Sequence, residues 1–366
     1  GSGVGEAATG IGVAVAVNIT EVETRASVSD ATLATGQLTV RARTMPATDP
    51  DANTYTAAAT SGSSAGGGNA ETDSLAIAGA LAIAAVTLAT IAAITGEVVL
   101  VGGGSVGIAA ATRTAAGATA APHEAAAPGA SGGLGTSVAL TSIGNTTTAA
   151  LQSGGGLTGV QDLRITADSR TAVTTTALGG ANGTGVALAG AFAVTTSTDR
   201  TSALIGAGSA PLVASGSVIL EARHSIPVTT IARGLVTGGD AAIGIVVALS
   251  ILDHAVRATT ARDITAGTSI TIGATGASSA VTTAEATAGG APGEDSANPS
   301  QPTASDTMES TRSFAEQAPG DAAAAVPATL PEPSTPDGNV SVAAAIAITL
   351  RRVGRRRHPH RAERRD

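Results

Sequence analysis

The chain has 366 residues, a formal net charge of −8, no cysteine, no tryptophan and an aromatic fraction of only 1%. The lack of cysteine excludes disulfide scaffolds, thiol catalysis and cysteine-based zinc or iron–sulfur sites. A hydrophobic fraction of 43% separates the chain from disordered proteins, but the shortage of large side chains argues against an ordinary enzyme core. We therefore expect a thin fold built from small residues.

Two short patterns alternate along the chain. The first is apolar-Ala-apolar, mostly followed by Asn, Thr or Ser, and its copies start at Val15, Leu81, Val138, Phe192, Val247 and Ile346. The second is apolar-x-apolar-x-Ala, and its copies start at Leu38, Val106, Leu163, Val218 and Ile270. Eight of the ten intervals between the key alanines are 26–29 residues long. This regularity indicates a repeat architecture.

The repeat is predicted to consist of strands. Apolar residues recur with period two, and Val, Ile and Thr are frequent between glycine-rich turns, a composition that favours strands over helices. The sequence therefore predicts an all-β protein, a β-solenoid over residues 1–290 with coils of about 27 residues. Stacked Ala, Val, Ile and Leu would fill its narrow interior. Eleven such coils would give a rod about 50 Å long.

Two segments lengthen the regular interval, residues 45–73 and 291–338, and a third, residues 115–133, is a smaller loop within an interval of ordinary length. Residues 45–73 and 115–133 contain proline and small polar residues, which predicts loops. Residues 291–338 hold eight of the fifteen prolines and eight acids against the single Arg312, which predicts a disordered acidic linker. Residues 339–350 start a further repeat.

One segment has a second interpretation. Leu75–Ile94 contains nothing more polar than Thr and is long enough to cross a bilayer as a helix. Its period-two apolar residues and acidic flanks favour a pair of strands. The membrane span is the alternative interpretation.

The C-terminal residues 351–366 hold eight of the 20 basic residues. They are either a basic tail that binds acidic lipids or nucleic acid, or the product of a frameshift near Leu350 in GC-rich DNA. Because the repeat stops in the middle of a strand, the frameshift is favoured. The rest of the chain is acidic, so we expect no nucleic-acid partner unless this tail is genuine.

Glycine motifs offer weak matches to nucleotide and hydrolase signatures. Gly102-x-Gly104-x-x-Gly107 and Gly154-x-Gly156-x-x-Gly159 match a dinucleotide fingerprint, but strands follow them where a helix is required, so we interpret them as solenoid corners. Gly62-x-Ser64-x-Gly66 matches a hydrolase elbow without the strand–turn–helix frame, so it is interpreted as a chance match.

Two charged patches could carry chemistry. They consist of Arg223 with His224, and of Asp253, His254, Arg257, Arg262 and Asp263. If both patches lay on one face of the rod, they could form a polysaccharide-cleaving site, but solvated exterior charge is the favoured interpretation. His123 has no partner at ligand spacing, and the calcium-binding nonapeptide is absent from the sequence. We therefore assign no catalytic, cofactor-binding or metal-binding residue, expect no cofactor, and predict that the chain is not an enzyme.

Threonine clusters suggest another alternative. In-register outward threonines could order water as an ice-binding surface does, although ordinary strand-favouring threonine is the preferred explanation. The clusters are Thr146–Thr148, Thr174–Thr176, Thr195–Thr196, Thr229–Thr230, Thr259–Thr260 and Thr282–Thr283.

The segments GVAVAVNITEVETRASV, GQLTVRART, VQDLRITADSRT and SGSVILEARHS together carry a family resemblance. Over about residues 1–290 and 339–349, the chain resembles the repetitive regions of very large secreted bacterial proteins, the filamentous-haemagglutinin-like and autotransporter-type adhesins with β-helical passengers. The resemblance implies a stalk or passenger segment outside the cell or at the bacterial surface. The partners it implies are host-cell, matrix or polysaccharide surfaces and neighbouring repeats of a longer chain.

Overall fold

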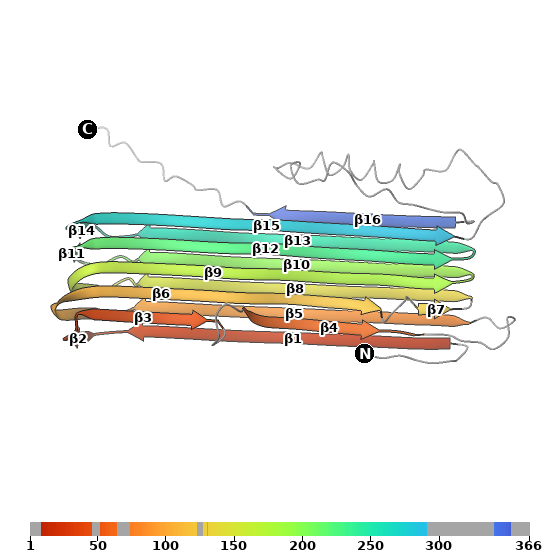
Figure 1. The fold of residues 1–366 in the computed structure, drawn as a ribbon, viewed down its shortest axis with the longest axis horizontal. Coiled ribbons are helices and arrows are strands. Elements are labelled where there is room, and N and C mark those ends of the chain that lie inside the picture. The colour runs from red at the N-terminus through yellow and green to blue at the C-terminus, as the bar shows by residue number, and fades with distance from the viewer. Residues whose placement is uncertain are drawn as a thin grey trace, which may run out of the picture.

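The structure, a computed structural model, describes residues 9–45, 52–63, 74–122, 127–129, 131–290 and 340–352. These residues form strands and turns, with no helix among them, and the strands lie in two stacked parallel sheets (Figure 1). The predicted all-β class is confirmed, and the arrangement is consistent with a β-solenoid. The predicted acidic linker at 291–338 and residues 353–366 of the C-terminal tail lie outside the described residues.

Sheet 1 contains six strands stacked one above another. In spatial order they are β1 (Thr9–Val28), β5 (Leu75–Ile94), β8 (Gly132–Leu151), β10 (Val186–Ile205), β13 (Ala241–Thr260) and β16 (Val340–Arg351). Every neighbouring pair is parallel and in register without a shift. Side chains at equivalent positions therefore form straight columns across the sheet.

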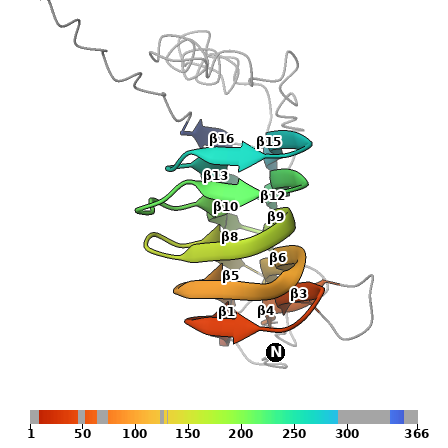
Figure 2. The same cartoon turned by 90° about the vertical axis from the view of Figure 1, so that its left-hand side faces the viewer.

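Sheet 2 faces sheet 1 and is also parallel. Its long strands are β6 (Glu97–Pro122), β9 (Gly156–Gly183), β12 (Ser217–Gly238) and β15 (Ser269–Gly290), and β3 (Gln37–Thr44) and β4 (Asn53–Ser61) pair with β6 on its free side. Four three-residue strands add to its ends: β2 (Ala31–Leu33), β7 (Ala127–Gly129), β11 (Leu212–Ala214) and β14 (Ile264–Ala266). The layers rise one above another along a single stacking direction (Figure 2).

The predicted coil of about 27 residues is wrong, because the two sequence patterns occupy different sheets. Ala139 of β8 pairs with Ala193 of β10, which pairs with Ala248 of β13, so paired neighbours are 54 and 55 residues apart. The 27-residue interval is the step from a strand of sheet 1 to the next strand of sheet 2. Six stacked strands span roughly 29 Å at about 4.8 Å each, and not the 50 Å expected from eleven coils.

Two predicted loops are partly strand. β4 lies inside the segment 45–73, and residues 115–122 continue β6, because alternate alanines there still face the interior. The segment Leu75–Ile94 is one unbroken strand, β5, between β1 and β8. Among the described residues, no helix is long and apolar enough to cross a membrane.

The patterns face the interior differently in the two sheets. In sheet 2 the large residues of the second pattern point inward, so Leu163 and Ile165 are buried. In sheet 1 the alanine of the first pattern points inward and its apolar neighbours point outward: Ala193 is 0% exposed, whereas Val15 is 62% exposed. The expectation that Val, Ile and Leu fill the interior is therefore correct for sheet 2 and wrong for the first half of the sheet 1 strands.

The interior is narrow at one end because glycine and alanine line it there. A methyl group at Gly135 of β8 would overlap the backbone carbonyl of Gly180 in β9, and one at Gly179 would overlap that of Gly190. Next to this contact lies a cluster of buried residues that are nearly all alanine. Towards the opposite end the interior widens to hold side chains such as Leu151.

Gly135→Ala should destabilise the fold, since the new methyl group would force the two sheets apart. The expected loss in the free energy of unfolding is about 1–3 kcal/mol, measured by urea denaturation. Gly144→Ala is the matched control, because Gly144 lies on the same strand and has open space around it. It should be neutral or stabilising by about 0.4–1 kcal/mol. Equal effects of the two substitutions would contradict the close approach of the sheets.

Candidate functional site

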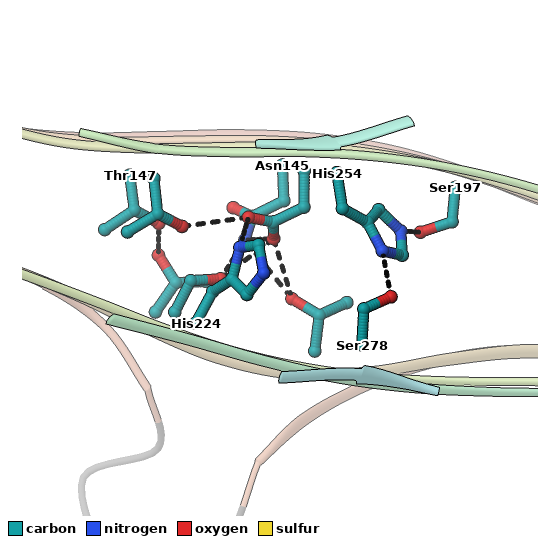
Figure 3. A network of polar contacts seen from close by, with 11 residues as sticks. Asn145, Thr147, Ser197, His224, His254 and Ser278 are labelled. Carbon is teal, nitrogen blue, oxygen red and sulfur yellow. Dashed lines mark hydrogen bonds and ion pairs between the residues drawn. The ribbon is translucent and has the colours of Figure 1, made fainter. Parts of the chain in front are cut away.

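A buried polar cluster lies between the sheets around Asp199 of β10 (Figure 3). Its Oδ2 accepts hydrogen bonds from Asn145 Nδ2 at 2.7 Å, Ser169 Oγ at 2.9 Å and Thr171 Oγ1 at 3.4 Å. Its Oδ1 accepts one from Thr201 Oγ1 at 2.9 Å. A buried carboxylate is tolerated only when it is well hydrogen-bonded, and these four donors replace the water that Asp199 has lost.

The register of the sheets brings this cluster together. Asn145, Asp199 and His254 form one inward column of sheet 1, and Ser169 and His224 are neighbours in an inward column of sheet 2. Asn145, Ser169 and Asp199 were not identified from the sequence. Their spacing could have indicated that they point inward, since each is an even number of residues from a buried alanine on its own strand.

The two histidines also meet in the interior. His224 Nδ1 lies 3.9 Å from Asp199 Oδ1. The ring of His254 is held at both nitrogens, with Nδ1 2.7 Å from Ser278 Oγ and Nε2 2.9 Å from Ser197 Oγ. The ring centroids are 6.2 Å apart in an edge-to-face arrangement. These residues tie adjacent layers of both sheets.

Burial determines the charge of these rings. It lowers the pKa of His224, an effect that Asp199 opposes and Arg351 reinforces. Burial also lowers the pKa of His254, opposed by Asp199 and Asp253 and reinforced by His224 and Arg351. Both rings are therefore expected to be neutral near pH 7.

Ser169, Asp199 and His224 have the residue types of a hydrolytic triad but not its arrangement. A serine nucleophile needs a hydrogen bond to the histidine that removes its proton, and it needs access to substrate. Ser169 instead donates to Asp199, with no hydrogen bond to His224 in the described part of the chain. The three residues are 0%, 0% and 8% exposed. This geometry supports a structural role.

Elsewhere in the interior, threonine and serine hydroxyls form two chains of hydrogen bonds that run back and forth between the sheets. We call these chains ladders. One ladder has successive oxygen distances of 2.6–2.8 Å and the other of 2.6–2.9 Å. A hydroxyl both donates and accepts, so such a ladder satisfies each interior member. The ladders are Thr141, Thr175, Thr195, Thr230, Ser250, Thr282 and Thr349, and Thr24, Thr44, Thr90, Thr112 and Thr147.

In most of the predicted threonine clusters, one member belongs to a ladder and points into the interior. Thr147 and Thr175 point into the interior, while their chain neighbours point out. One outward column of sheet 2 contains Gly117, Thr174, Thr229 and Val281. The in-register exterior threonine array that the ice-binding alternative requires is not formed in this column.

The charged residues of the proposed polysaccharide-cleaving face do not converge on one surface. His224 and His254 point inward, Arg223 lies on the outer face of sheet 2, and Asp253 and Arg257 lie on the outer face of sheet 1. Arg223 pairs with Glu221 at 3.3 Å, and Asp253 pairs with Arg200 at 2.9 Å.

The remaining candidate residues take part in the turn after β13 or lie elsewhere. Arg262 donates from Nε to the Gly206 carbonyl at 2.7 Å, and the Asp263 carbonyl accepts the Leu212 amide at 2.9 Å. Gly62 directly follows β4, whereas Ser64, Gly66 and His123 lie outside the described residues.

The glycine motifs lie in strands and corners. Gly154 has positive φ in the turn between β8 and β9, so the start of this motif is a corner as predicted. Gly159 also has positive φ, but it lies inside β9, beside the shift in register with β6. Gly102 and Gly103 also have positive φ, but they lie within β6, beside a shift in its register with β9. The first motif is therefore a bulge, and a strand continues on both sides of it.

A groove of about 490 Å³ crosses the outer face of sheet 2. Its floor is Gly107 and Ala109 of β6, and its walls include Arg41 of β3 and Arg164 of β9. The groove exists because small outward residues on β6 lie between larger ones on the adjacent strands. The groove could not be predicted from the sequence, because it depends on which outward residues of β3, β6 and β9 are brought side by side by strand pairing.

The groove offers positive charge. Arg164 donates to Glu221 at 2.9 Å, and Glu221 also pairs with Arg223. Arg41 is exposed and has no ion-pair partner among the described residues. Asp162, on the groove wall, is engaged in the fold, since its Oδ1 accepts the Ser217 amide at 2.8 Å.

Comparisons with family models, curated proteins and solved structures find no match to this chain. In the part of the chain that the structure describes, no group of three or more His, Asp or Glu side chains is placed to hold a metal ion.

Thr195→Val should cost about 1–3 kcal/mol in the free energy of unfolding, because Thr175 and Thr230 would each lose a buried partner. Thr196→Val is the control, since Thr196 is the outward neighbour and carries no ladder contact among the described hydrogen bonds. Chemical denaturation of both variants measures the difference. A neutral Thr195→Val would show that the ladder does not stabilise the fold.

Acidification should destabilise the fold through the two histidines. A histidine whose pKa is lowered by folding contributes its full stability above its ordinary value of 6.5, and that stability is lost as the pH falls below it. We expect the free energy of unfolding to decrease between about pH 7.5 and pH 5.5. His254→Asn should flatten this dependence, whereas a wild-type stability that is constant or rises on acidification would contradict the assignment.

Proposed function

We propose that the chain is a structural and adhesive β-solenoid segment, a stalk or passenger of a large secreted or surface-displayed bacterial protein, which binds its ligand without chemical turnover. The observation that carries this proposal is where the reactive side chains lie. The Asp199 cluster is buried and its carboxylate accepts four hydrogen bonds, and the exposed charges of the other candidate residues are divided between two opposite faces. Acid–base catalysis needs such groups to converge on a substrate.

We propose that each coil comprises about 55 residues, one long strand from each sheet, closed by the corners that join them. Strands of 20 to 28 residues then make two broad, flat outer faces. Faces of this shape suit extended ligands, since a polymer can lie along or across many strands. The resemblance of the repeats to adhesin passengers supports the same role and a location outside the cell or at its surface.

The ligand we propose for the groove in sheet 2 is an anionic polysaccharide. Arg41 and Arg164 offer guanidinium groups that match carboxylate or sulfate oxygens. Thr39 and Thr166 line the same groove and offer hydroxyls for sugar hydroxyls. A shallow, open groove accommodates a chain that continues beyond it at both ends.

Arg41→Gln should weaken binding of an acidic polysaccharide such as polygalacturonate or heparin by about tenfold, through the loss of a charge-assisted hydrogen bond. Arg170→Gln is the control, because Arg170 is exposed on the same face, outside the groove. Isothermal titration calorimetry measures affinity, and size analysis of the polysaccharide measures turnover.

Two results would overturn the proposal. Shortening of the polysaccharide during incubation would identify an enzyme. Equal binding by the wild type and Arg41→Gln would show that the groove is not the binding site.

A further inference from the structure

The outer face of sheet 1 carries a continuous apolar surface along the first half of its strands. The column of outward side chains that starts at Ile11 continues through Ile77, Leu134, Leu188, Ile243 and Val342. The columns that start at Val15 and Val17 likewise contain only Val, Ile, Leu and Phe. We call the outward residues from Ile11 to Ile19, with their in-register partners, the apolar face.

The apolar face contains no charged side chain and ends abruptly. The next outward column along the strands contains Glu21 of β1 and Asp253 of β13, and charged residues such as Arg200 follow. Charged groups on the outer face of sheet 2 include Arg164, Glu221 and Arg233, which belong to ion pairs. The first half of the outer face of sheet 1 is therefore free of charge, whereas its second half and the outer face of sheet 2 carry charged residues.

The residues of the apolar face are too exposed for an ordinary solvated surface. On the edge strand β1, Val13 and Val15 are 60% and 62% exposed, and on the inner strands Leu188 and Ile245 are 39% and 48% exposed. The Ile19 column carries Ala85, Ser142 and Thr196 on β5, β8 and β10, so only the four columns from Ile11 to Val17 are counted. Six strands about 4.8 Å apart and four outward positions about 6.6 Å apart give a face of roughly 29 Å by 26 Å, or about 760 Å². A monomer rarely exposes a contiguous apolar patch this large, and each partner in a standard protein interface contributes about 800 Å².

The relief of the apolar face is complementary to itself. The column between those of Ile11 and Val15 contains Gly79, Thr136 and Gly190 on β5, β8 and β10, so a shallow channel runs between two aliphatic ridges on these three strands. The Phe192 ring lies beside Gly190, since its Cε2 is 3.1 Å from where a Cβ would be. The ring partly fills the channel at Gly190, whereas the channel is open at Gly79, where a ridge residue of another such face can enter it.

We propose that a second copy of this chain packs on the apolar face, sheet against sheet, in a two-fold symmetric dimer. The area matches that of a stable interface, and the absence of charge means that no ionic group is desolvated on docking. A two-fold axis parallel to the stacking direction, between the columns of Val13 and Val15, places the Val15 column of each copy over the channel of the other. The charged halves of the strands then lie outside the contact. Val138 and Phe192 then lie near the axis. Two sheets packed in this way are about 10 Å apart.

A lipid surface fits the same face less well. Proteins that lie on membranes combine an apolar face with basic and aromatic residues at its border. Here the border begins with Glu21 and Asp253, and Phe192 is the single aromatic residue among the described columns.

The first test is the mass of the particle in solution. Sedimentation velocity of the whole chain should show a dimer, and Val138→Lys with Phe192→Lys should convert it to a monomer with an unchanged circular dichroism spectrum. Ile231→Lys is the control, since Ile231 points outward from sheet 2, and it should remain dimeric. A monomeric wild type at near-millimolar concentration, or a dimer that survives the double substitution, would overturn the proposal.

A second test does not depend on a disruptive substitution. Because the chain has no cysteine, Phe192→Cys introduces a single thiol at the centre of the apolar face. A bismaleimide that spans about 10 Å should link two copies through Cys at this position but not through Ile231→Cys. Absence of the covalent dimer, or binding of the wild-type monomer to neutral phosphatidylcholine vesicles in its place, would overturn the proposal in favour of the lipid surface.

Discussion

The in-register stacking of parallel strands is the constraint on which the rest of the molecule depends. Because each strand repeats the one below at about 4.8 Å, every inward position becomes a column whose members must tolerate one another. Alanine columns do so by packing, and threonine columns do so by hydrogen bonding across to the facing sheet. A carboxylate cannot be stacked in this way, and Asp199 accordingly has the amide of Asn145 on one side and the imidazole of His254 on the other. The interior thus accepts polar groups only where the column supplies a partner.

The narrow end of the interior explains the unusual exterior. Where Gly135 meets Gly180, the backbones of the sheets are so close that glycine and alanine predominate between them. The β-branched and large aliphatic residues that favour strand pairing are consequently displaced to the outer positions of sheet 1. The apolar face is therefore linked to the thinness of the core, and the same residues that stabilise the strands create a surface that needs a partner.

The sequence predicted the parts of the fold that depend on periodicity. Period two and the alternating patterns indicated strands, and they identified Leu75–Ile94 as strand despite its length. Periodicity does not show which side chains of a strand point inward, and it does not show which strands pair with each other. Val15-Ala16-Val17 is compatible with either face inward, and a constant interval of 27 residues does not tell whether consecutive strands pair or face each other. The polar cluster depends on both, so Asp199 and Ser169 were not identified, and His224 was predicted to lie on the surface.

Dimerisation through the apolar face of sheet 1 would affect how the groove of sheet 2 binds its ligand. If the apolar faces of two copies are buried together, both grooves of sheet 2 remain on the outside and point in opposite directions. A long polymer or a cell surface could then engage two copies at once, and the second contact would form at the effective concentration set by the first. Modest affinity in each open groove would be sufficient for strong attachment, which agrees with a groove that has one unpaired arginine and no deep pocket. Adhesion would in this way depend on self-association, although the two surfaces lie on different sheets and share no residue.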